Sequence, residues 1–172
     1  MGLLNFLKEQ LEVIRKKDPS VKSASEVILY PGVKALFYYK LAHELYKRKH
    51  FFLSRYLSQR AARKTGIEIH PGASIGKGFF IDHGIGTIIG ETAEIGENVT
   101  IYQGVTLGAN SNMNGKRHPT IYDNVIIYSG AKIIGNICVG RNSVIGAGAV
   151  IVKSIPENCI AVGVPAKIIR RS

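Results

Sequence analysis

Three scarcities narrow the possibilities for this 172-residue chain. No stretch offers the roughly 18 uninterrupted apolar residues of a membrane-spanning helix, so no membrane span is expected. Charge appears already at Lys8 and Glu9, which is too early for a secretory signal peptide. The two cysteines, Cys138 and Cys159, cannot form a disulfide framework and are interpreted as small buried residues. These features predict a cytoplasmic protein.

Acidic residues are also scarce, with 12 against 23 basic ones. The imbalance is concentrated in residues 1–66, which carry 14 basic and 5 acidic residues; residues 67–172 carry 9 and 7. Such a basic half could bind nucleic acid or an acidic membrane. No nucleic-acid motif or aromatic stacking platform accompanies it, so we expect neither partner. We interpret the charge as a solvated face that also attracts an anionic cofactor.

The apolar residues of the first part recur at helical spacing, as in Leu4, Leu7, Leu11 and Ile14. Pro31 suits the first turn of a helix, and Gly66 suits a helix C-cap. The expected helices cover residues 3–17, 25–28, 31–48 and 52–64. We therefore predict a small α-helical N-terminal domain over residues 1–66.

From Ile67 the apolar period changes to six and persists to the end of the chain. Every anchor of this hexad is Ile, Leu or Val: Ile69, Ile75, Ile81, Ile89, Ile95, Ile101, Leu107, Ile121, Ile127, Ile133, Val139, Ile145 and Ile151. Three six-residue faces make one triangular coil, and the Gly or Asn beside an anchor would allow the positive φ of a corner. The pattern predicts a mainly β fold over residues 67–172, a left-handed parallel β-helix with a protruding loop at 108–119 and a short C-terminal segment.

The repeat is irregular at two places, and these are the candidate sites. The step from Ile81 to Ile89 is eight residues long and contains His83. The second irregularity is the loop that ends in Lys116-Arg117-His118-Pro119. A solenoid wall alone offers no pocket, so we expect ligands to bind where the chain leaves the wall, next to a neighbouring subunit.

His83 is the candidate general base, because the pKa of a free imidazole lies near neutrality. An acceptor has to fix its tautomer. Asp82 is its neighbour, but adjacent residues on an extended strand point to opposite sides. Glu68 lies 15 residues earlier, three short of a full turn of about 18, and the insertion that carries His83 could bring the two side by side. We therefore predict that Glu68 orients His83.

A carboxylate and an ammonium could both be held by the remaining candidates. Arg117 offers a two-pronged donor for a carboxylate. Asp18 and Asp82 could hold an ammonium. One arginine with two aspartates would suit an amino acid.

Specific motifs carry a family resemblance. The chain contains DHG and GETA around the eight-residue step, GKRHP at the loop end, KKDPSVKS before the helices and AVGVPAKII near the C-terminus. In these motifs the chain resembles the serine O-acetyltransferases of the hexapeptide-repeat acyltransferase superfamily, in a form with a short N-terminal domain. The resemblance covers residues from about Asp18 to Ile169.

The resemblance implies transfer of acetyl from acetyl-CoA to the hydroxyl of L-serine, the first step of cysteine biosynthesis, in a ternary complex without an acyl-enzyme. His83 matches the family's general base, and Glu68 falls at its acidic partner. Asp18 and Asp82 match the ammonium-binding pair. Arg117 and His118 match the residues that hold the substrate carboxylate.

The resemblance also implies how acetyl-CoA, a co-substrate rather than a resident cofactor, is bound. Ser129, Gly130 and Ala147 fall at positions that line its site, and Lys167 suits a CoA phosphate. The family usually has Gly-Gly-Thr-Gly near the thioester, where this chain has Gly108-Ala109-Asn110-Ser111, so Ala109 is the candidate contact there. No metal is expected.

A homotrimer is expected, with a hexamer built from two trimers as an open alternative. The chain ends at Arg170-Arg171-Ser172 and lacks the Ile-ending tail with which many members bind cysteine synthase, so that complex is not expected. Two alternative functions stay open: O-acetylation of a sugar or another small hydroxyl compound, and a non-enzymatic scaffold or metal protein. A zinc site could use His70, His83 and His118, although no zinc-type ligand spacing recurs.

Overall fold

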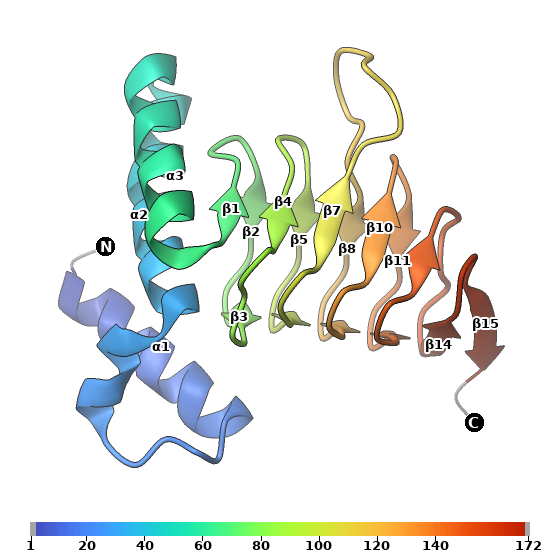
Figure 1. The fold of residues 1–172 in the computed structure, drawn as a ribbon, viewed down its shortest axis with the longest axis horizontal. Helices are drawn as coiled ribbons and strands as arrows, with labels where there is room; N and C mark the ends of the chain where they lie inside the picture. The colour runs from blue at the N-terminus through green and yellow to red at the C-terminus, as the bar shows by residue number, and fades with distance from the viewer. Residues whose placement is uncertain (1–2, 171–172) are drawn as a thin grey trace.

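The structure is a computed structural model that describes residues 3–170, and it places a layer of helices at one end of a three-sided stack of short strands (Figure 1). The helices are α1 (Leu3–Lys17), the 3-10 helix η1 (Ala24–Leu29), α2 (Pro31–Lys47) and α3 (Phe51–Thr65). They differ from the expected ranges by at most one residue at each end. Arg171 and Ser172, on which the prediction about the tail partly rests, lie outside the described residues.

The helices begin and end where local chemistry dictates. Pro31 occupies the first turn of α2, where its missing N–H costs nothing. Gly66 caps α3 in the left-handed conformation at φ 70°, and its N–H donates to the Ala62 carbonyl. Within residues 3–170, no helix combines the length and the apolar character needed to cross a bilayer.

The remainder is a parallel β-helix whose three faces are three sheets. Sheet A has the order β1-β4-β7-β10-β13, sheet B β11-β8-β5-β2, and sheet C β15-β14-β12-β9-β6-β3. Only β14 and β15 pair antiparallel among these strands. The left-handed parallel β-helix predicted from the hexad is thus confirmed.

The strands are β1 (Glu68–Ile69), β2 (Ser74–Ile75), β3 (Phe80–Ile81), β4 (Ile88–Ile89), β5 (Glu94–Ile95), β6 (Thr100–Ile101), β7 (Thr106–Gly108), β8 (Thr120–Ile121), β9 (Ile126–Ile127), β10 (Lys132–Ile134), β11 (Cys138–Val139), β12 (Val144–Ile145), β13 (Val150–Ile151), β14 (Cys159–Val162) and β15 (Lys167–Arg170).

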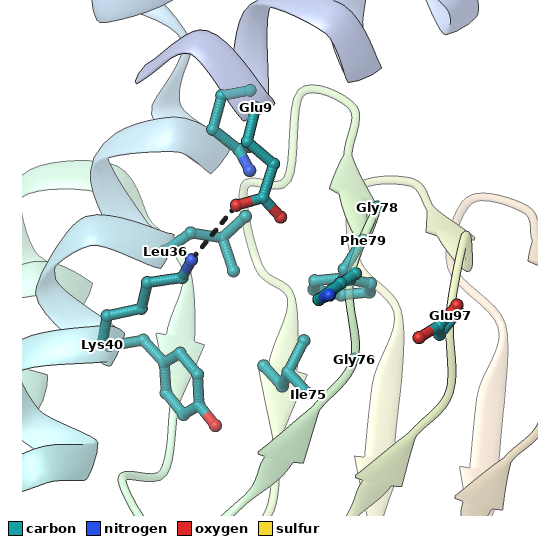
Figure 2. A pocket seen from close by; sticks show the side chains of 11 residues that line it. Glu9, Leu36, Lys40, Ile75, Gly76, Gly78, Phe79 and Glu97 are labelled. Atoms are coloured by element: carbon teal, nitrogen blue, oxygen red, sulfur yellow. Dashed lines mark ion pairs between the residues drawn. The ribbon is translucent and has the colours of Figure 1, made fainter. Parts of the chain in front are cut away.

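The hexad anchors form the core. Twelve of the thirteen anchors are buried, and the exception is Ile75, which is partly buried. Ile75 faces a cavity of about 270 Å³ between α1, α2 and the first coil (Figure 2). That cavity also contains the ion pair between Glu9 and Lys40, at 3.6 Å, and none of the expected site residues.

The corners correct one expectation. The glycines directly after the anchors, such as Gly76 and Gly90, do not have positive φ. Positive φ falls three residues after the anchors that end strands of sheets B and C, for example at Asn98 and Gly130. The glycines beside the anchors serve close packing instead. A Cβ on Gly76, for instance, would lie 2.6 Å from the carbonyl oxygen of Gly96 in the next coil.

The helical layer is attached to the first coil by direct contacts. A Cβ on Gly32 of α2 would lie 2.5 Å from the Ile81 carbonyl oxygen, so helix and strand touch at that point. The Ser58 hydroxyl donates to the Ile69 carbonyl at 2.8 Å, and the Tyr39 hydroxyl donates to the Ala73 carbonyl at 2.6 Å. These contacts hold α2 and α3 on the first coil. The end of α1, where Asp18 follows, is held by Lys17, whose ammonium donates to the Thr100 hydroxyl at 2.7 Å and to the Asn98 carbonyl at 2.9 Å.

Candidate active site

His83 lies in a pocket of about 380 Å³ between the helical layer and the first coil. The pocket brings together three residues expected from the sequence, Asp18, Asp82 and His83. They come from the segment after α1 and the segment after β3, which are more than 60 residues apart in the chain. Its lining residues are Asp18, Ser20, Leu29, Tyr30, Pro31, Asp82, His83 and Ile85.

The backbone at His83 differs from what the sequence argument assumed. β3 ends at Ile81, and His83 has φ 55°, so it is not part of an extended strand. Its Nε2 therefore lies 3.8 Å from Asp82 Oδ1, although alternation on a strand would separate the two side chains. Glu68 instead forms an ion pair with Arg55 at 3.5 Å, and among residues 3–170 no ion pair joins it to His83.

Asp18 is held as an ionised carboxylate facing the pocket. The Ser20 N–H donates to its Oδ1 at 2.8 Å, and the Tyr30 hydroxyl donates to Oδ2. Hydrogen bonding from Ser20, and then from Tyr30, holds the pKa of Asp18 below its usual value. The sequence did not reveal Tyr30, because a tyrosine before a helix-starting proline carries no catalytic signal.

Arg117 lies in a second cluster at the base of the loop. Its guanidinium forms an ion pair with Glu91, whose other oxygen accepts a 2.8 Å hydrogen bond from the Tyr46 hydroxyl of α2. The hydrogen bond from Arg117 is the main cause that lowers the pKa of Glu91. Glu91 and Tyr46 were not candidates from sequence, although Glu91 belongs to the GETA motif. The two residues fix the orientation of the Arg117 fork.

His118 is buried beside Arg117, with 7% of its surface exposed. The Thr92 N–H donates to its Nδ1 at 3.2 Å, and the Thr92 hydroxyl lies 2.9 Å from the same atom. A backbone N–H can only donate, so Nδ1 is the acceptor and the neutral ring carries its proton on Nε2. Burial, ahead of the Arg117 charge, lowers the pKa of His118, which favours this neutral form.

The two clusters do not meet within one chain. In the described part, residues 3–170, no pocket, hydrogen bond or ion pair connects Asp18, Asp82 and His83 with Arg117 and His118. The His83 cluster lies at the corner that follows β3 of sheet C. The Arg117 cluster lies where the loop after β7 joins β8 of sheet B. A single chain thus presents two separate half-sites.

Three of the five candidate acetyl-CoA residues, Ser129, Gly130 and Ala147, lie along one corner of the solenoid. The Gly148 N–H donates to the Ser129 carbonyl at 2.8 Å, so Ala147-Gly148 lies directly beyond Ser129-Gly130. The same ladder runs from Gly130 to Gln103 and from Gly104 to Ile85, which lines the His83 pocket. Ala109 lies apart at the end of β7, and Lys167 lies on β15.

The three histidines of the metal alternative do not converge. The His70 ring accepts the Gly72 N–H and packs edge-on against Tyr46. His83 and His118 lie in the two different clusters described above. Within residues 3–170 no group of three or more His, Cys, Asp or Glu side chains could hold a metal ion.

Comparison with known proteins identifies the family. The chain is 54% identical over 165 residues to the serine acetyltransferase of Bacillus licheniformis, which covers 95% of this chain and 76% of that protein. It is 52% identical over 166 residues to the serine acetyltransferase of Helicobacter pylori strain J99, covering 96% and 97%. The chain belongs to the serine acetyltransferase family. It is therefore an acyltransferase that uses acetyl-CoA as donor and serine as acceptor.

Solved structures agree with this assignment. The serine acetyltransferase of Neisseria gonorrhoeae matches with a TM-score of 0.94 and 38% identity, covering 98% of this chain and 65% of that one. A Brucella abortus serine acetyltransferase in complex with coenzyme A matches with a TM-score of 0.92 and 40% identity, covering 98% and 68%. No family model matches the sequence. The resemblance noted in the motifs is confirmed.

Proposed function

We propose that the chain acetylates L-serine directly in a ternary complex, with His83 as the general base. The observation that carries this proposal is the pocket in which His83 faces Asp18 and Asp82. His83 removes the proton of the serine hydroxyl while that oxygen attacks the thioester carbonyl. The carbon–sulfur bond then breaks, and the CoA sulfur leaves and takes up a proton. Cys138 and Cys159 do not line the pocket, so an acyl-enzyme is not needed.

The carboxylate that orients His83 is part of the same proposal. Glu68 remains the orienting carboxylate that the family resemblance implies, although in a single chain it forms an ion pair with Arg55. Asp82 is the nearer carboxylate in a single chain. Replacing Glu68 by Gln and Asp82 by Asn separates the two roles. Loss of the orienting group lowers kcat, whereas loss of an ammonium contact raises KM for serine.

Substrate recognition uses both half-sites. Asp18 and Asp82 attract the serine ammonium, and the low pKa of Asp18 keeps it charged near neutral pH. Arg117, held by Glu91, and the Nε2–H of His118 bind the serine carboxylate. Both ends of the amino acid are then held while its hydroxyl faces His83.

We place the complete active site between neighbouring chains of a homotrimer, because the two half-sites do not meet in one chain. A sharp test mixes His83→Ala and Arg117→Ala subunits, each inactive alone. Random trimers should regain about a quarter of wild-type activity, since an intact site needs one undamaged half from each neighbour. Failure of mixed trimers to recover activity would place the whole site in one chain. Light scattering distinguishes the trimer from a hexamer.

Acetyl-CoA lies along the corner of Ser129, Gly130 and Ala147 in this proposal. The corner passes Ile85, which lines the His83 pocket, so a donor that lies along it brings its thioester close to the base. Lys167, farther along the solenoid, offers an ammonium to a CoA phosphate, and Ala109 lies at the loop that covers the donor. The small residues at this corner allow a ligand to approach the backbone closely.

We also propose that residues 1–66 and 67–172 are two domains, because α3 ends at Thr65 and the first strand begins at Glu68. The cytoplasm is the proposed location, since it keeps the two free thiols reduced.

The direct test is CoA release from acetyl-CoA with L-serine, L-homoserine, L-threonine and simple sugars, in wild type and His83→Ala. Serine should be the preferred acceptor, and the variant should lose activity. A sugar as the better acceptor would contradict the roles of Asp18, Asp82 and Arg117.

A further inference from the structure

The cavity between α1, α2 and the first coil contains no residue of the His83 or Arg117 clusters (Figure 2). Its volume is about 270 Å³, and we call it the α1 cavity. A second cavity, of about 480 Å³, shares Glu9, Lys77 and Gly78 with it, so the two adjoin. The α1 cavity is therefore a separate space whose lining has no role in the proposed function.

Gln10 of α1 is a buried polar residue that lines the α1 cavity. Only 4% of it is exposed, and within residues 3–170 its side chain makes no hydrogen bond. In the same part of the chain, every side-chain polar atom that is wholly removed from solvent has a partner, so the Gln10 amide has to reach the solvent of the cavity. An amide confined in this way has few water partners, and a polar ligand would supply them.

The floor of the α1 cavity is apolar. Ile75 is the one hexad anchor of the thirteen that is not buried, and it lines this cavity. Leu36 of α2 and Phe79 of the first coil lie beside it (Figure 2). Apolar surface that stays partly exposed inside a cavity gains free energy when an apolar group of a ligand covers it.

The charged residues of the α1 cavity comprise two of each sign. Glu9 and Lys40, on the helical side, form an ion pair at 3.6 Å. Lys77 and Glu97, on the solenoid side, form no ion pair within residues 3–170. A ligand with a single charge would meet a like charge in this lining, whereas a zwitterion can match both signs.

We propose that the α1 cavity binds a small zwitterionic amino acid with an apolar side chain, at a site separate from the serine site. The volume lies below that of pockets for drug-sized ligands, which excludes a nucleotide. The ligand's ammonium pairs with Glu9, and its carboxylate pairs with Lys40 and accepts a hydrogen bond from the Gln10 amide. Its side chain packs on Ile75 and Phe79.

Methyl NMR of protein with carbon-13 in its isoleucine methyl groups detects occupancy directly. L-valine, L-leucine and L-methionine are the probes. The Ile75 methyl signal should shift and saturate with at least one of them, and Arg117→Ala, which damages the serine site, should retain that shift. No shift of Ile75 with any of the three, or its loss in Arg117→Ala, would overturn the proposal.

Two analogues of L-valine test the zwitterion. L-valinamide lacks the carboxylate, and isovalerate lacks the ammonium. Each should bind about tenfold more weakly than L-valine or worse, because one charge-assisted contact is lost. Equal affinity of either analogue would show that the cavity recognises only the apolar group, which contradicts the proposal.

Lys40→Met is compared with the matched control Lys47→Met. Both lysines belong to α2 and both form an ion pair, but Lys47 does not line the α1 cavity. Lys40→Met should weaken binding of the probe about tenfold or more, while Lys47→Met should leave it unchanged. Equal effects of the two variants would refute the role of Lys40.

Gln10→Leu separates binding from folding. Leucine suits both the helix and the apolar floor, so the melting temperature of the free protein should stay the same or rise. Binding of the probe should nevertheless be lost. A lower melting temperature would mean that Gln10 stabilises the fold, and unchanged binding would mean that it does not contact the ligand; either result overturns its assignment. These measurements need no catalytic turnover, so they succeed or fail independently of the proposed function.

Discussion

Replacing Gly90 by Ala should displace His118 without straining the backbone. Gly90 follows the anchor Ile89 and does not have a positive φ, so alanine fits its conformation. The new Cβ would, however, lie 2.0 Å from His118 Cδ2 and 2.1 Å from Nε2. The buried ring has to move, and its contacts with Thr92 are then lost.

The size of the effect follows from those contacts. Thr92 makes two hydrogen-bonding contacts to His118 Nδ1, and each hydrogen bond contributes about 1 kcal/mol net. Their loss, with displacement of the Nε2–H from the serine carboxylate, should reduce kcat/KM for serine about 10- to 100-fold. Gly108→Ala is the control, and it is compared at saturating acetyl-CoA because Gly108 adjoins the candidate donor contact Ala109. It occupies the same position after the next anchor of sheet A, and its new Cβ meets only flexible side-chain ends, Ile134 Cδ1 at 3.0 Å first.

Steady-state kinetics of a double-mutant cycle decides the matter. In a His118→Ala background the clash disappears, so Gly90→Ala should add almost nothing to the loss already caused by His118→Ala. Wild-type kcat/KM in Gly90→Ala, or full additivity of the two losses, would refute the idea that Gly90 acts through His118. Circular dichroism confirms that the solenoid remains folded.

Three further predictions concern other parts of the molecule. His83→Ala should lower kcat about 10²- to 10⁴-fold, while CoA affinity measured by calorimetry stays at the wild-type value. Burial lowers the pKa of Lys17 from 10.5 to about 8, so the folded state binds this proton less tightly than the unfolded state. The free energy of unfolding should therefore rise between pH 8 and pH 10.5, and urea titrations of Lys17→Met should show a smaller rise. Asn142→Ala should lower the free energy of unfolding by about 1–3 kcal/mol, because it removes side-chain hydrogen bonds to Asn124 and Asn158 and places alanine at φ 57°. A thermal melt of Asn142→Ala that matches the wild type would contradict this account.

The regular part of the fold could be predicted because it repeats. An aliphatic residue every six positions has to point inward from every face, and twelve of the thirteen anchors are indeed buried. The exception, Ile75, depends on how the helices pack on the first coil. Corner geometry was less accessible, because glycine has two uses. Glycine permits a positive φ at Gly130 and close packing at Gly76, and the sequence does not distinguish these two roles.

The candidate site was only partly visible in the sequence. His83 and Arg117 could be selected because both interrupt the repeat, and family motifs supplied Asp18. The preference for Glu68 over Asp82 assumed an extended backbone at His83, and the left-handed conformation there removes that premise. Which carboxylate orients the base therefore stays a prediction. The motif GETA contained Glu91, but its contact with Arg117 depends on the fold of a loop.

The sequence by itself determined the left-handed β-helix, the helical segments that precede it and the serine acetyltransferase family, since periodicity and motifs are local properties of the chain. Only the tertiary structure decided which of these residues meet. Asp18 reaches the His83 pocket because α1 packs on the first coil, and Tyr102 stacks on Tyr128 because parallel register aligns the coils. Such contacts join residues far apart in sequence. They depend on packing and register in space, which no local pattern records.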